Sequence, residues 1–155
     1  MSALELIRGY RRLDDHLATS GMPAPEHFAA MRAEGFEVVI NLALPTSDFA
    51  MANEGELVSA QRMTYVHIPV NFEAPTADDF QRFASVMDAF AGRNVFVHCA
   101  ANMRVSAFVF LNRMRTRSVP RAQAEADLFA IWNPDGVWRN FVNAQLASWG
   151  ANPLY

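Results

Sequence analysis

The chain has 155 residues, of which 52% are hydrophobic and 19% charged, as is typical of a globular domain rather than a disordered protein. Its net charge of −3 argues against general nucleic-acid binding, and its longest apolar runs are too short to span a bilayer. All thirteen basic residues are arginine, which excludes lysine chemistry, and a single cysteine permits neither an internal disulfide nor a cysteine-rich metal site. The N-terminal segment carries charges where a signal peptide would be apolar, so we expect one cytoplasmic domain over residues 1–155.

Strand and helix patterns alternate along the chain. The expected elements, in chain order, are a helix at 25–34, a strand at 38–44, a helix at 53–60, a strand at 64–70, a helix at 76–90, a strand at 94–98, and helices at 104–117, 121–131 and 135–148. The helix at 76–90 has the clearest start, because Thr76 and Asp79 have the spacing of a capping box. Four arginines, 113, 115, 117 and 121, are expected to form a solvated face near a helix C-terminus.

Near-continuous apolar strands separated by helices indicate an α/β fold with a central, mainly parallel sheet of about four to five strands and helices on both faces. In such sheets, ligands bind beyond the carboxyl ends of the strands. Cys99 follows the expected strand 94–98 at that end, so the fold class predicts a site where this cysteine lies.

The stretch VFVHCAANMRVSAF, residues 95–108, contains the chemistry that such a site needs. Free cysteine has a pKa of about 8.5 and attacks well only as the thiolate, which a helix N-terminus and a nearby arginine favour. The same helix end presents backbone amides that bind phosphate, and Arg104 could grip two phosphate oxygens. Ser106 could donate a hydrogen bond to the cysteine sulfur and make it a better leaving group. The alternative is a structural role for Cys99, because free cysteine is among the most buried residue types.

Several segments together resemble the cysteine-dependent protein phosphatases, specifically the compact dual-specificity-like branch of the protein tyrosine phosphatase superfamily found in bacteria. These segments are LATSG at 17–21, VINL at 39–42, YVHIPV at 65–70 and VHCA at 97–100, followed by Ser106, and they come in that family's order. The resemblance implies hydrolysis of phosphate monoesters, of the phosphotyrosine or phosphoprotein type, through a phosphocysteine intermediate. It also implies no cofactor and no metal, with a phosphorylated protein or small molecule as the partner and neither nucleic acid nor membrane; the oligomeric state stays open.

The resemblance assigns roles to the residues of this loop. Cys99 would be the nucleophile, Arg104 would bind the phosphate oxygens, and Ser106 would assist breakdown of the intermediate. His98 would hold the loop through backbone hydrogen bonds, since the histidines show no metal-ligand spacing. The phosphate cradle is expected at Ala100, Ala101, Asn102, Met103 and Arg104.

The sequence departs from the family pattern at two points, and the first is the spacing within the loop. The family signature has five residues between cysteine and arginine, but only four separate Cys99 from Arg104, and Asn102 replaces the usual glycine. Aligned without a gap, Ser106 keeps its family position while Val105 falls on the arginine position; alternatively, the cradle is one residue tighter.

The second departure concerns the general acid. Asn71 stands after the strand where the family often has an aspartate, and an amide cannot serve as the acid. We expect Asp78 to take this role, with Asp79, Glu73 and the more distant Asp135 as alternatives, although Asp79 is also the capping-box residue.

Two other functions are compatible with the loop. A rhodanese-type sulfurtransferase has the four-residue spacing and carries a persulfide on its cysteine, but the Asp-Val-Arg and Gly-His-Ile segments of that family are missing from the first half of the chain. A catalytically inert module that only binds phosphate would also fit the absence of the post-strand aspartate.

Overall fold

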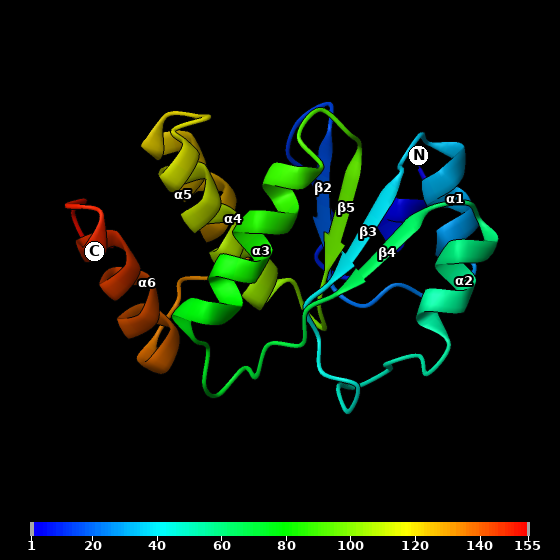
Figure 1. Cartoon of the computed structure of the whole chain (residues 1–155), viewed down its shortest axis with the longest axis horizontal. Coiled ribbons are helices and arrows are strands. Elements are labelled where there is room, and N and C mark those ends of the chain that lie inside the picture. The colour runs from blue at the N-terminus through cyan, green and yellow to red at the C-terminus, as the bar shows by residue number, and fades with distance from the viewer. Residues whose placement is uncertain (1, 155) are drawn as a thin grey trace.

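The computed structural model describes residues 2–154 and folds them around one sheet (Figure 1). The elements, in chain order, are the 3-10 helix η1 (Ala3–Leu6), β1 (Arg11–Arg12), β2 (Leu17–Ser20), α1 (His27–Ala33), β3 (Val38–Asn41), α2 (Glu54–Ala60), β4 (Thr64–His67), α3 (Ala77–Ala89), β5 (Val95–His98), α4 (Met103–Thr116), α5 (Arg121–Phe129) and α6 (Gly136–Ser148).

The sheet has five strands in the order β1-β2-β5-β3-β4. β1 is antiparallel to β2, whereas β2, β5, β3 and β4 run parallel to their neighbours. This topology confirms the mainly parallel sheet that the sequence predicts. β5 lies at its centre, so the residue that follows β5 emerges in the middle of the carboxyl edge.

Each face of the sheet is covered by its own set of helices (Figure 1). Along β5, Val95 and Val97 pack into the cluster formed with α3, α4, α5 and α6, while Phe96 packs into the cluster formed with η1, α1 and α2. This alternation follows from the two-residue repeat of a strand. Both faces are therefore apolar, which explains the continuous hydrophobic runs in the sequence.

The elements differ from the sequence expectations mainly at strand ends and near the N-terminus. β3 stops at Asn41 because the Asn41 side chain accepts from the amide of Ala43 at 2.8 Å and turns the chain away. β4 stops at His67, just before Pro69, which has no amide to donate to a neighbour. The pattern reading missed η1, β1 and β2, because these segments are two to four residues long and carry polar or charged side chains.

The start of α3 confirms the predicted capping box. Thr76 Oγ1 accepts from the Asp79 amide at 3.0 Å, and Asp79 Oδ2 accepts from the Thr76 amide at 3.1 Å. The arginine prediction is wrong for Arg113, whose side chain is buried in an ion pair with Asp127. Within residues 2–154, none of the helices combines the length and apolarity that crossing a membrane requires.

Candidate active site

Cys99 lies at the carboxyl end of the central strand and at the start of the loop that leads to α4. Its amide donates to the Ser20 carbonyl of β2 at 3.3 Å, and only 1% of the residue is exposed. A second bond ties the loop to the segment after β2, because the Met22 amide donates to the Ala100 carbonyl at 3.1 Å. Cys99 is therefore fixed at the base of the loop, beneath the N-terminus of a 14-residue helix.

The amides that follow Cys99 are the first feature that suits an anion. In the described chain, the amides of Ala100, Ala101, Met103 and Arg104 donate to no other protein group. The last two begin α4, where no intrahelical acceptor exists, and a helix N-terminus favours negative charge. The segment that follows Cys99 therefore offers several unpaired backbone donors.

Asn102 explains how the loop works without the glycine of the family pattern. Its φ of 65° lies in the left-handed region, which Asn tolerates better than most non-glycine residues. Its Nδ2 donates to the Gly9 carbonyl at 2.8 Å and to Thr19 Oγ1 at 3.0 Å. Asn102 thus keeps the backbone turn and adds an anchor to the N-terminal segment. Its Oδ1 is buried with no partner.

Arg104 projects from the first turn of α4 toward the segment that follows β4. Its Nη1 donates to the Val70 carbonyl at 2.9 Å, and its Cζ lies 5.9 Å from the centre of the Phe72 ring. The residue is only 5% exposed, and its Nε is buried with no partner. Val105, which holds the family's arginine position in a gap-free alignment, is fully buried in the core. Arg104 is therefore the arginine that this loop presents.

Ser106 does not make the hydrogen bond to the Cys99 sulfur that the sequence suggested. Its hydroxyl donates to the Met103 carbonyl at 3.1 Å and accepts from the Trp132 indole at 3.0 Å. The Trp132 indole also reaches the Met103 carbonyl, at 3.1 Å. The hydroxyl proton is used within the first turn of α4, so Ser106 braces the helix start in this structure.

His98 is part of a buried polar chain that the sequence analysis did not find. Its Nδ1 lies 3.2 Å from the Cys99 carbonyl, which fits the expected backbone role, and its Nε2 lies 2.5 Å from Glu54 Oε2. Glu54 Oε1 accepts from Asn41 Nδ2 at 3.3 Å, and Asn41 Nδ2 also lies 3.1 Å from the Tyr65 hydroxyl. Burial raises the pKa of Tyr65 to about 12, helped by the Glu54 carboxylate and opposed by the Asn41 hydrogen bond. The sequence contains one indication of this polar chain, because Glu54 lies four residues before the buried Val58 and so on the same face of α2.

The candidate general acids lie at the surface. The Asp78 side chain is 72% exposed and pairs with Arg82 of its own helix at 2.6 Å. The Asp79 carboxylate is used by the capping box, and both Glu73 and Asp135 are exposed. Within residues 2–154, no hydrogen bond or ion pair joins any of the four to the loop after Cys99.

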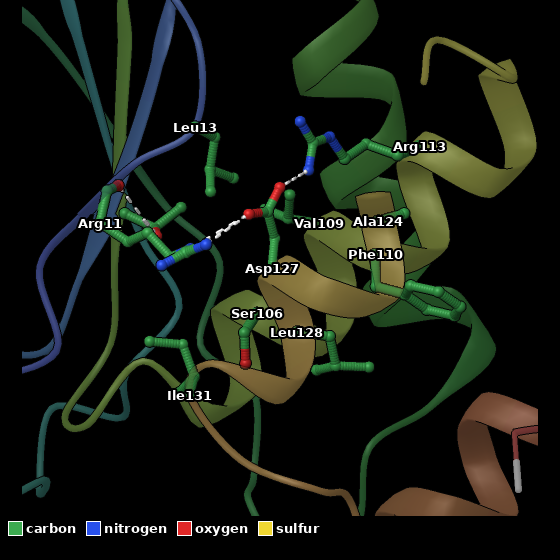
Figure 2. Close-up of a pocket in the computed structure, with 11 residues that line it drawn as sticks. Arg11, Leu13, Ser106, Val109, Phe110, Arg113, Ala124, Asp127, Leu128 and Ile131 are labelled. Carbon is green, nitrogen blue, oxygen red and sulfur yellow. Dashed lines mark hydrogen bonds and ion pairs between the residues drawn. The ribbon is translucent and has the colours of Figure 1, made fainter. Parts of the chain in front are cut away.

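A separate small cavity lies on the far side of Ser106 (Figure 2). Its volume is about 10 Å³, which is room for a single water molecule. Arg11, Arg113 and Asp127 form its polar side, and Cys99 is not among its lining residues. This cavity is too small for a substrate. In the described residues, no cluster of three or more His, Cys, Asp or Glu side chains could hold a metal ion.

The fold and the loop define a cysteine-dependent phosphatase of the dual-specificity class, and comparison with known proteins supports this class. A family model for a dual-specificity protein tyrosine phosphatase domain fused to NAD+ kinase matches residues 11–133, so the chain belongs to this phosphatase family. The match favours a phosphatase over the sulfurtransferase that the loop spacing also allowed.

Solved structures agree with the family assignment. A candidate phosphatase (DUF442) from Shewanella putrefaciens CN-32 is 32% identical, with a TM-score of 0.83 over 94% of this chain and 95% of that chain. Tk-PTP in its active form is 19% identical, with a TM-score of 0.69 over 90% of this chain and 95% of that one. PTPMT1 in complex with PI(5)P is 14% identical, with a TM-score of 0.71 over 90% and 97%. The last two show the fold alone. Comparison with curated proteins finds no match.

Proposed function

We propose that the protein hydrolyses phosphate monoesters, of the phosphotyrosine or phosphoprotein type, through a phosphocysteine intermediate on Cys99. The observation that supports this most strongly is the coincidence of unpaired loop amides with the buried, partly unpaired guanidinium of Arg104. A phosphoryl group has three equatorial oxygens that need such donors, and their negative charge suits a helix N-terminus.

In the first step, the Cys99 thiolate attacks phosphorus, the S–P bond forms and the P–O bond to the alcohol breaks. The amides of Ala100, Ala101, Met103 and Arg104 would hold the equatorial oxygens, and the guanidinium of Arg104 would add two further donors. In the second step, water attacks the phosphocysteine, which releases inorganic phosphate and restores the thiolate. Ser106 would act in this step by holding the first turn of α4 in place.

The experiment that tests the reaction is hydrolysis of p-nitrophenyl phosphate at mildly acidic pH by the wild type and by Cys99→Ser. We expect turnover in the wild type and none in the variant. Turnover that survives in the variant contradicts the phosphocysteine route. A wild type that binds inorganic phosphate but shows no turnover would instead identify an inert phosphate-binding module, and a thiosulfate-to-cyanide assay would test the sulfurtransferase alternative.

Asp78 is the proposed general acid, and a leaving-group comparison tests it separately. The p-nitrophenolate ion leaves without a proton, whereas the tyrosine or serine oxygen of a phosphopeptide needs one. We expect Asp78→Asn to hydrolyse p-nitrophenyl phosphate almost normally and a phosphopeptide at least tenfold more slowly. If both substrates react as with the wild type, the acid is another group, and Glu73→Gln is the next variant to measure.

A further inference from the structure

A buried histidine–glutamate pair contacts the backbone of the proposed nucleophile. His98, the last residue of the central strand, is 0% exposed, and Glu54, the first residue of α2, is 2% exposed. The reaction proposed above does not use Glu54, and a buried charged residue is costly unless it is paired. Glu54 contacts His98, which in turn contacts the Cys99 carbonyl, so Glu54 is placed to influence Cys99.

The contacts of the His98 ring fix how many protons the pair holds. The Cys99 carbonyl can only accept, so the 3.2 Å contact to Nδ1 requires a proton on Nδ1. The 2.5 Å contact between Nε2 and Glu54 Oε2 requires a second proton between those atoms. The Asn41 amide donates to the other carboxylate oxygen at 3.3 Å, so both oxygens of Glu54 are engaged. Two forms of the pair satisfy these contacts: an imidazolium beside an ionised Glu54, and a neutral ring beside a protonated Glu54.

We propose that Glu54 is a positioning residue that keeps His98 doubly protonated, so that the Cys99 thiolate forms beside a fixed positive charge. This inference rests on the proposed role of Cys99 as a thiolate nucleophile. A neighbouring imidazolium stabilises a thiolate. The same ring holds the Cys99 carbonyl and so orients the peptide that leads into the phosphate cradle.

The neighbouring polar groups do not supply the negative charge that the Glu54 carboxylate would present to His98. Tyr65 faces Asn41 from β4 and stays uncharged, because burial raises its pKa to about 12. His67 of β4 is occupied by the Ala43 carbonyl at 2.7 Å. Glu54 is thus the carboxylate in contact with His98.

The test is the rate at which iodoacetamide alkylates Cys99, measured by mass spectrometry from about pH 5.5 to about pH 9. Because Cys99 is the only cysteine, all label reports on it. Glu54→Gln keeps the side-chain shape and can still bond His98 and Asn41, but it needs no positive charge on the ring. We expect Glu54→Gln to react about tenfold more slowly than the wild type at about pH 6 and to converge with it at alkaline pH. The matched control is Glu56→Gln, the same change at an exposed position of the same helix, which should follow the wild type throughout.

A profile for Glu54→Gln that matches the wild type, or that is slower by the same factor at every pH, overturns the proposal, because general loosening of the loop would not depend on protonation. Should the variant fold poorly or the reagent fail to enter, nitrogen-15 NMR of the wild type decides the question. Protons on both ring nitrogens of His98 near neutral pH support the proposal, and a neutral ring overturns it. Neither measurement requires turnover, so a failure of phosphatase activity would be seen separately from a failure of this inference.

Discussion

At the scale of single residues, the spacing between Cys99 and Arg104 is the feature that separates this loop from the family pattern. The structure relates the short spacing to two neighbouring substitutions. Asn102 takes the left-handed conformation, and Val105 is fully buried in the core. Arg104 then leaves the helix from one position earlier and rests against the Val70 carbonyl. The arginine that follows Cys99 therefore projects from the first turn of α4.

The first prediction concerns that arginine. We expect Arg104→Ala to lower kcat and raise KM for an aryl phosphate, with kcat/KM reduced about a hundredfold or more, because the guanidinium grip should tighten in the transition state. Arg104→Lys should recover only part of the loss, since an ammonium lacks the planar pair of donors. Steady-state kinetics of the three proteins measure this. Unchanged kinetics in Arg104→Ala would remove Arg104 from the site.

The second prediction uses the backbone of Asn102. Asn102→Gly loses the side-chain bonds to Gly9 and Thr19 but fits the φ of 65° freely, whereas Asn102→Ala loses the bonds and also strains the backbone. We expect the alanine variant to be less stable than the glycine variant by about 1–2 kcal/mol in urea unfolding. Equal stabilities would show that the left-handed turn is not kept in solution.

At the scale of elements, the long helices were predictable and the short N-terminal strands were not. The helix predicted over 76–90 is found as Ala77–Ala89, because its cap and its apolar face are both local in sequence. β2 is buried at all four positions, yet its pattern LATS reads as polar and its partner β5 lies far away in the chain. A two-residue strand such as β1 carries no periodicity at all.

The capping box of α3 provides the third prediction. Thr76→Ala removes the acceptor for the Asp79 amide and should lower the free energy of unfolding by about 1 kcal/mol. Asp79→Ala should act similarly, because it removes the reciprocal bond to the Thr76 amide. Gln81→Ala, at an exposed position of the same helix, is the control and should be close to neutral. An Asp79→Ala variant of normal stability that loses the acidic limb of its pH–rate profile would instead identify Asp79 as the catalytic acid.

At the scale of the whole molecule, the position of Cys99 at the carboxyl edge of the sheet was predictable, but the residues that contact its loop were not. The parallel-sheet rule placed Cys99 at the carboxyl end of β5, and the local sequence placed Arg104 in the first turn of the helix that follows. The partners of that loop come from Gly9, Thr19, Glu54 and Trp132, which only the tertiary fold brings together. Sequence periodicity shows which face of a helix is apolar, but it does not show which distant side chain will meet a buried histidine.

Both faces of the one sheet are packed by residues from across the chain, so we expect residues 1–155 to unfold as a single domain. The ion cluster seen in Figure 2 joins distant parts of that unit. Asp127 of α5 accepts from Arg11 of β1 at 2.8 Å and from Arg113 of α4 at 2.6 Å. Burial alone would raise the pKa of Asp127, but the hydrogen bonds from Arg113 and Arg11 outweigh it and lower the pKa.

The fourth prediction is that Asp127→Asn lowers the free energy of unfolding by about 3 kcal/mol at neutral pH, because it leaves the buried Arg113 without its carboxylate. Asp88→Asn, which breaks the exposed pair with Arg115, is the control and should cost less than about 1 kcal/mol. Because the folded-state pKa of Asp127 is lowered, its stabilisation is complete above the ordinary aspartate value of about 3.9 and is lost as the pH falls through the folded-state value. Urea unfolding at about pH 7 and about pH 3 should therefore show the gap between wild type and Asp127→Asn narrowing in acid. A gap that stays constant or widens would mean that Asp127 stabilises the fold by packing rather than by its charge.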